Sequence, residues 1–135
     1  MKVSPFAGVA TAPRVPRWLV QAYAILAIAA LARSSYQLAT DAAGAPVAYG
    51  LSAVAAGFYL VAAAALARST RSMRALGAAR LIAAAELAAV VTVGAAGLLH
   101  PAWFPRATVW SGFGSGYGLA PLLLPAFTLW RTRAR

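Results

Sequence analysis

The chain has 135 residues, of which 62% are hydrophobic and only 10% are charged. This composition, with a mean hydropathy of +0.74, excludes an ordinary soluble domain and predicts a multi-pass membrane protein. The formal net charge is +10, but the arginines lie mainly between apolar segments, so we expect them to set the membrane topology and not to bind nucleic acid.

The amino-terminal region predicts a basic tail followed by a first transmembrane helix. Residues 1–17 contain three basic residues and three prolines, which is typical of a short cytoplasmic tail. The apolar segment at residues 18–40 would extend about 35 Å as a helix, which is enough to cross a bilayer. The competing interpretation is a signal peptide cut near residues 43–45; the long basic lead and the proline at position 46 favour a transmembrane helix.

Three further apolar segments complete a predicted bundle of four transmembrane helices. The turn-forming stretch DAAGAP follows the first segment, and the aromatic, proline-containing stretch HPAWFPR lies between the third and the fourth. The second, third and fourth spans are predicted at residues 47–67, 76–99 and 108–130. The predicted all-α transmembrane domain therefore covers residues 18–130, and a basic tail follows at residues 131–135.

The basic residues lie on one side of this predicted topology. Both tails and the short loop between the second and third spans are rich in arginine, whereas Arg106 is the one basic residue in the two other loops. Because positive residues are retained on the cytoplasmic side, we expect both termini to be cytoplasmic and the protein to lie in the plasma membrane. Four tryptophans fall at predicted span ends, as an interfacial aromatic belt requires: Trp18, Trp103, Trp110 and Trp130.

Glu86 lies about ten residues inside the third predicted span and is one of only two acidic residues in the chain. A carboxylate at this depth costs about 2.5–3.5 kcal/mol on insertion scales, so it should face a partner or a wet cavity. Arg33 of the first span is the expected partner, since it would lie about 6 Å outside the bilayer centre and Glu86 about 3 Å inside it. The alternative is a protonated, neutral Glu86.

Further polar residues recur at helical spacing in the outer half of the predicted bundle. On the first helix they occur at positions i, i+3 and i+4, and single tyrosines on the second and fourth helices could join them. The predicted intramembrane polar cluster comprises Arg33, Tyr36, Gln37, Tyr59, Glu86 and Tyr117. Interhelical hydrogen bonds, an outward-facing ligand cavity and an interface with another protein are the three interpretations of this cluster.

The stretch GFGSGYG in the fourth predicted span lacks the spacing of a phosphate-binding loop. Its glycines form two overlapping pairs with four-residue spacing, which favours close packing between helices. The predicted packing residues are Gly112, Gly114, Gly116 and Gly118. The alternative is an unwound segment that lines a site, since irregular backbone at membrane depth is tolerated only inside protein or beside water.

The carboxyl-terminal half resembles small uncharacterised four-helix integral membrane proteins of actinobacteria. The resemblance is carried by Glu86-Leu87, Phe104-Pro105, Thr108-Val109-Trp110-Ser111, Phe113-Gly114, Gly116-Tyr117-Gly118 and the segment from Pro121 to Pro125. It implies the four-helix fold and the host class, and it implies no activity.

The sequence contains no cysteine, a single histidine, and no nucleophile–base pair, carboxylate pair or metal-ligand cluster. We therefore expect no enzyme, no metal and no cofactor. The favoured function is a small accessory or assembly protein whose partners are the lipid bilayer and a larger membrane protein or copies of itself. The alternative is a protein that binds or transports a small amphipathic or lipid-like molecule in a polar cavity in the outer half of the bundle.

Overall fold

The protein is a bundle of helices, as a computed structural model describes it for residues 15–133. The elements in chain order are α1 (Arg17–Asp41), α2 (Pro46–Arg68), α3 (Met73–Leu99), the short 3₁₀ helices η1 (Pro101–Trp103) and η2 (Ser111–Tyr117), and α4 (Ala120–Thr132). The described part of the chain contains no strand, so the predicted all-α class is confirmed. Most of the predicted amino-terminal tail and the last two residues lie outside the described residues.

Within residues 15–133, the helices α1, α2 and α3 are long and apolar enough to cross a membrane. The first three predicted spans lie inside these helices. Local signals account for two of the starts: Pro46 occupies the first turn of α2, where its missing N–H is no loss, and the hydroxyl of Ser72 accepts a hydrogen bond from the Ala75 N–H at the start of α3.

The predicted fourth span is not one continuous helix. The helix α4 has 13 residues, which extend about 20 Å, less than the roughly 30 Å of a bilayer core. The preceding glycine-rich segment forms η2 and contains left-handed residues, including Phe113 at φ 58° and Leu119 at φ 62°. Alternating glycines lower the helix propensity of this segment, and a left-handed backbone cannot continue a right-handed helix.

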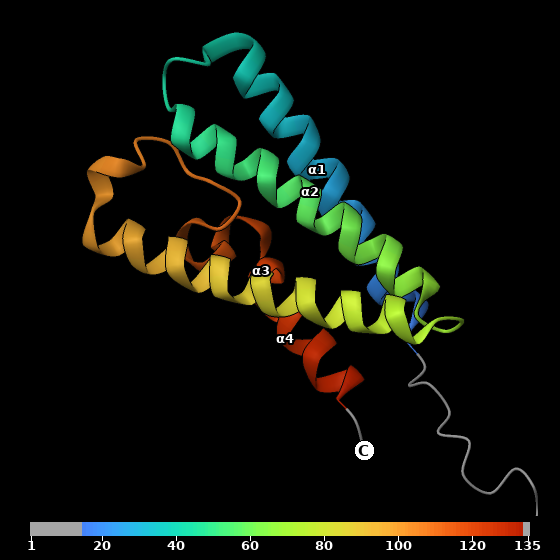
Figure 1. The fold of residues 1–135 in the computed structure, drawn as a ribbon. Helices are drawn as coiled ribbons and strands as arrows, with labels where there is room; N and C mark the ends of the chain where they lie inside the picture. Colours follow the sequence, from blue (N-terminus) through green and yellow to red (C-terminus); the bar gives the residue numbers. More distant parts are fainter. Residues whose placement is uncertain (1–14, 134–135) are drawn as a thin grey trace, which may run out of the picture.

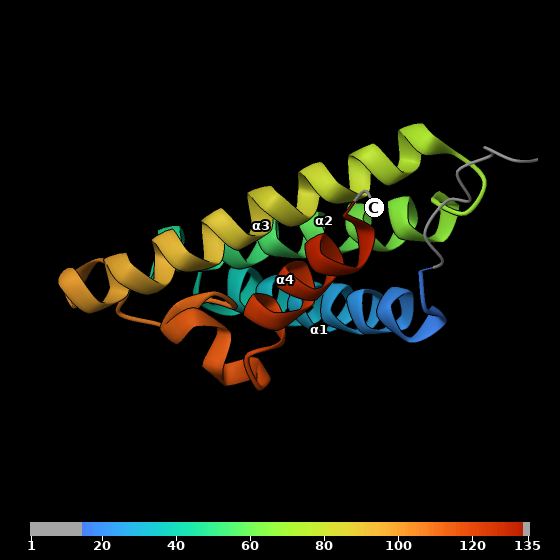
Figure 2. The ribbon, with the colours of Figure 1, turned by 90° about the horizontal axis from the view of Figure 1, so that it is seen from below.

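Helices α1 and α2 form an antiparallel hairpin, and α3 diverges from α2 after a tight turn (Figure 1). The loop that follows η1 crosses between the diverging ends of α2 and α3 before the chain enters η2. Viewed from below, α4 runs along α3 and beside α1 (Figure 2), and it packs mainly on α3. The loop and α4 together therefore occupy the place that the sequence predicts for a fourth spanning helix.

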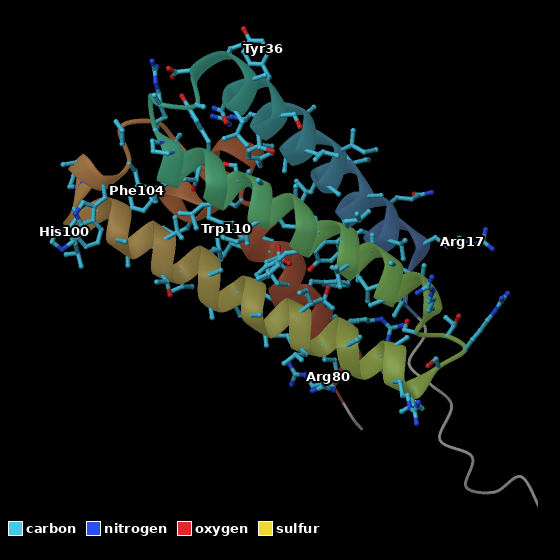
Figure 3. The ribbon with its side chains drawn as sticks, turned by 45° about the horizontal axis from the view of Figure 1, so that its top comes forward. Arg17, Tyr36, Arg80, His100, Phe104 and Trp110 are labelled. Carbon is cyan, nitrogen blue, oxygen red and sulfur yellow. The ribbon has the colours of Figure 1, made fainter. Side chains whose placement is uncertain are left out.

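One end of the bundle is strongly basic. Arg17 and Arg80 lie toward this end, and His100 lies at the opposite end (Figure 3). Both described ends of the chain lie on the same side as Arg17 and Arg80 (Figure 1). We call this the basic end; among the described residues, the arginines of the helix ends and the turn that lie there are Arg17, Arg68, Arg71, Arg74, Arg80, Arg131 and Arg133. The guanidinium of Arg80 donates a hydrogen bond of 2.6 Å to the Thr132 carbonyl, which places a cation at the carboxyl end of α4.

Candidate functional site

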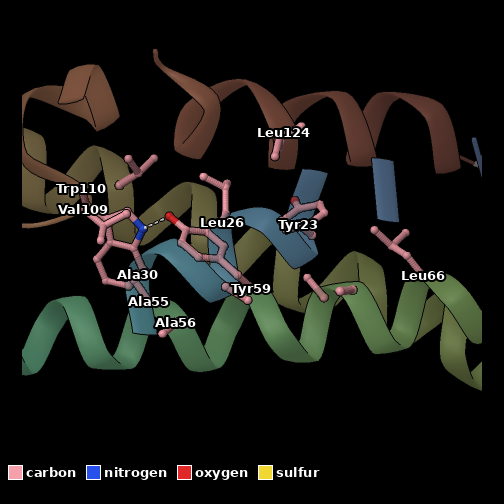
Figure 4. Packing of buried hydrophobic residues seen from close by; sticks show 14 of the residues in the cluster. Tyr23, Leu26, Ala30, Ala55, Ala56, Tyr59, Leu66, Val109, Trp110 and Leu124 are labelled. Carbon is pink, nitrogen blue, oxygen red and sulfur yellow. Dashed lines mark hydrogen bonds between the residues drawn. The ribbon is translucent and has the colours of Figure 1, made fainter. Parts of the chain in front are cut away.

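A group of buried polar side chains lies in the middle of the bundle, and each of the four α-helices contributes one of them. We call this group the polar core: Tyr23 from α1, Tyr59 from α2, Glu86 from α3 and Thr128 from α4. None of the four side chains is more than 1% exposed. Figure 4 shows the two tyrosines among the alanines and leucines that surround them.

Hydrogen bonds join most of the polar core to its surroundings. The Tyr23 hydroxyl lies 3.4 Å from the Thr128 hydroxyl, which itself donates to the Leu124 carbonyl at 2.8 Å. The Trp110 indole N–H donates to the Tyr59 hydroxyl at 3.0 Å, as the dashed line in Figure 4 shows. The two tyrosine rings are tilted at a centroid distance of 6.3 Å, a geometry that aromatic pairs favour. These contacts fix α1, α2, α4 and the loop relative to one another.

Glu86 differs from the rest of the polar core because it has no hydrogen-bond partner. The side chain is fully buried, and neither carboxyl oxygen is paired with any described residue. The carboxyl group lies close enough to the phenols of Tyr23 and Tyr59 to interact with both electrostatically. An unpaired buried carboxyl group loses its hydration and gains no hydrogen bond in exchange. The burial of Glu86 therefore lowers the stability of the folded protein.

The predicted partnership of Arg33 with Glu86 is wrong in this structure. The Arg33 guanidinium lies over the ring of Tyr117, 5.9 Å from its centroid, in a cation–π arrangement. The reason is the break before α4, which brings Tyr117 from η2 within reach of α1. The rise per residue of a helix could place Arg33 near Glu86, but it could not predict that the Tyr117 ring would contact the Arg33 guanidinium instead.

The predicted polar cluster therefore separates into parts. Tyr59 and Glu86 lie in the polar core, and Arg33 contacts Tyr117. The Tyr36 side chain is 70% exposed and points away from the bundle (Figure 3). Gln37 is half-buried, and its side-chain oxygen is buried without a partner.

Sequence reasoning missed Tyr23, Thr128 and the role of Trp110. Tyr23 could have been found, because it lies with Leu19, Leu26 and Ala30 on one face of α1 at helical spacing, and all four are buried. Trp110 is only 2% exposed and does not belong to an interfacial aromatic belt. Its burial follows from the course of the loop, which has no periodic signal in the sequence.

Side chains from α2 and η2 accept hydrogen bonds from the backbone of the irregular loop. The Ser52 hydroxyl accepts a hydrogen bond from the Val109 N–H at 3.3 Å, and this pair is buried. The Thr108 N–H donates to the Ser111 hydroxyl at 2.8 Å. Such partners are required wherever non-helical backbone lies at membrane depth.

The glycines of η2 do not bring helices together as predicted. A Cβ added at Gly116 or Gly118 would meet nothing within 4 Å, one added at Gly112 would meet Ser115 of the same segment, and one added at Gly114 would meet the Pro121 ring at the start of α4. Between segments distant in the sequence, a close approach occurs at Gly94 of α3, where an added Cβ would overlap the ring of Phe113 from η2. The unwound segment, which the sequence offered as the alternative, is what the structure shows.

The best-formed surface grooves of the described residues lie away from the predicted cluster. Four grooves have volumes of about 250–460 Å³, and Arg33, Tyr59, Glu86 and Tyr117 line none of these four. Within residues 15–133, no three His, Asp or Glu side chains come together as metal ligands. Chemically, the polar core offers one buried carboxyl group in the neighbourhood of two phenols.

Comparison with known proteins adds no relative to this description. No protein-family model, no curated protein and no solved structure matches the chain. The class is therefore defined by the fold alone: a helical protein with three described helices that are long and apolar enough to cross a membrane.

Proposed function

We propose that the protein is a small, non-enzymatic accessory or assembly subunit of the plasma membrane, which packs against a larger membrane protein or against itself. Large apolar side chains are exposed along the long helices, for example Ile28, Leu60, Leu81 and Val91, and they suit a lipid environment. The basic end would then face the cytoplasm. With α4 and the loop as a broken fourth crossing, both termini would be cytoplasmic.

The observation that carries the proposal is the large unpartnered surface of α3. Only 22% of the residues in the most apolar stretch of α3 are buried, whereas 44% are buried in the corresponding stretch of α2. We call the exposed stripe in the middle of this helix the outer face of α3; it comprises Leu81, Ala84, Ala85, Ala88, Val91 and Thr92. Small residues on such a face let another helix approach closely, and the Thr92 hydroxyl can donate a hydrogen bond across the contact.

The topology is tested with reporter fusions at each end of the full chain. We expect both the amino-terminal and the carboxyl-terminal reporter to show a cytoplasmic location, because both described ends of the chain lie at the basic end. A phosphatase reporter that is active outside the cytoplasm serves as the reciprocal control. An external carboxyl terminus would contradict the proposed fourth crossing.

The accessory role is tested by purifying the tagged full chain from its own host in mild detergent and identifying bound proteins by mass spectrometry. We expect one membrane protein, or a second copy of this chain, in fixed stoichiometry. The double substitution Ala84→Leu and Ala88→Leu should abolish its recovery, because two bulky side chains hold a neighbouring helix away from the outer face of α3.

The matched control is Ala64→Leu, which adds the same side chain to an exposed position on α2. It should leave partner recovery unchanged, and all variants should keep the parent's thermal stability in detergent. If the chain is recovered alone and as a monomer, or if the partner survives the substitutions on α3, the proposed accessory role is wrong.

Glu86 favours a second function, the binding or transport of a small amphipathic molecule. Its buried, unpaired carboxyl group could pair with a polar group of such a molecule. The left-handed residues at positions 112–114 and 118–119 support this alternative, since irregular segments at membrane depth are found where they line a cavity or lie inside protein. A small molecule retained by the parent through purification, and lost from Glu86→Gln, would favour this function over the accessory role.

A further inference from the structure

A groove of about 460 Å³ opens at the basic end, between the start of α1 and the end of α2. Its walls include the aliphatic side chains of Val20, Leu66 and Ala67. Its polar side chains come from Arg17, Gln21 and Thr70. The groove is therefore amphipathic, and its volume lies within the range of small-molecule sites.

The arginines around this groove have no carboxylate side chain to neutralise them. Arg68 and Arg71 lie beside Ala67 and Thr70 in the sequence, and both are exposed. The chain has two acidic residues, and neither is at the basic end: Asp41 accepts a hydrogen bond from the Tyr49 hydroxyl at the opposite end, and Glu86 is buried in the polar core. An anion that balances these arginines must come from outside the side chains of the protein.

We propose that this groove binds an anionic phospholipid of the cytoplasmic leaflet. Arg17, with the hydroxyl of Thr70 and the amide of Gln21, would hold the phosphate group. Val20, Leu66 and Ala67 would contact the first part of an acyl chain. The inference depends on a membrane setting and not on the accessory role.

Two features favour a lipid over a free phosphate ion. The aliphatic walls give a soluble anion nothing to contact, whereas an acyl chain would cover them. The same end of the bundle also carries an interfacial aromatic group: the Trp18 and Phe127 rings lie 5.0 Å apart, and the Phe127 and Trp130 rings lie 5.6 Å apart. Trp18 and Trp130 are about half exposed, as expected for side chains at the headgroup level.

The test is a titration of the purified full chain in mild detergent with dioleoylphosphatidylglycerol, followed by native mass spectrometry. Dioleoylphosphatidylcholine is the neutral lipid and inorganic phosphate the soluble competitor. We expect the anionic lipid to bind more tightly than the neutral one and to remain bound in the presence of millimolar phosphate. The substitution Arg17→Gln should weaken its binding about fivefold, the contribution of one basic residue near a membrane surface.

The matched control is Arg106→Gln, which removes an exposed arginine at the opposite end and should leave the binding unchanged. Ala67→Phe fills the groove without changing its charge and should weaken lipid binding by at least as much as Arg17→Gln. Arg17 and Ala67 are both exposed, so both variants should fold, and their circular dichroism spectra should match the parent's.

Three results would overturn the proposal. Equal binding of the two lipids would show that headgroup charge is not recognised. Displacement of the lipid by inorganic phosphate would reduce the groove to a simple anion site. Parental lipid affinity in Arg17→Gln or Ala67→Phe would place the lipid elsewhere. None of these outcomes bears on partner recovery through α3, so the two proposals fail separately.

Discussion

Replacing Gly114 with alanine is expected to lower the free energy of unfolding by about 2–5 kcal/mol in detergent. Gly114 has φ of 83°, in the left-handed region, where a Cβ costs about 1–2 kcal/mol. The added Cβ would also lie 2.9 Å from three atoms of the Pro121 ring, and overpacking of this kind costs about 1–3 kcal/mol. Pro121 is buried at the start of α4, so the ring has little freedom to move away.

Two neighbouring glycines separate these contributions. Gly118 is left-handed, with φ of 64°, but an added Cβ would meet nothing within 4 Å, so Gly118→Ala should cost only the backbone term of about 1–2 kcal/mol. Gly116 has neither feature, and Gly116→Ala should change stability by less than about 0.5 kcal/mol. Thermal unfolding followed by circular dichroism should therefore rank the losses as Gly114, Gly118, Gly116. Equal losses at all three would mean that the segment is an ordinary helix.

Replacing Glu86 with leucine is expected to raise the free energy of unfolding by about 1–3 kcal/mol. Most substitutions of fully buried residues destabilise, but here the buried group is an unpaired carboxyl, and leucine has a similar volume with no polar atom to desolvate. The matched control is Glu86→Gln, which keeps an unpaired polar group and should bring no such gain. A loss of stability in Glu86→Leu would show that the carboxyl group has partners that this structure lacks.

The same residue gives a double-mutant cycle that separates the structure from the expectation based on helix geometry. Because Arg33 contacts Tyr117 and not Glu86, the effects of Arg33→Gln and Glu86→Gln should add to within about 0.5 kcal/mol. A coupling energy larger than this would show that Arg33 and Glu86 interact, as the sequence predicts. If the effects add and Glu86→Leu is stabilising, Glu86 is kept for a role other than stability, which is the expectation for the binding or transport alternative.

Much of the architecture could be predicted from local sequence. Hydropathy and length locate α1, α2 and α3, because a helix that buries its backbone hydrogen bonds in lipid must be apolar over its full length. The basic end also follows from the sequence, since arginines flank the apolar segments and helices of similar length alternate in direction. Glu86 is recognised as unusual from its depth alone, and the structure buries it completely.

Tertiary structure decided the form of the fourth predicted span and the contents of the polar core. Residues 108–130 are apolar enough for a helix, but whether glycines favour close packing or a left-handed break depends on what surrounds them, here Phe113 against Gly94 and Pro121 against Gly114. That break carries Trp110 to Tyr59 and Tyr117 to Arg33. Hydropathy and helical periodicity describe one segment at a time, whereas these partners lie far apart in the sequence. Only the packed chain therefore determines that Glu86 has no hydrogen-bond partner.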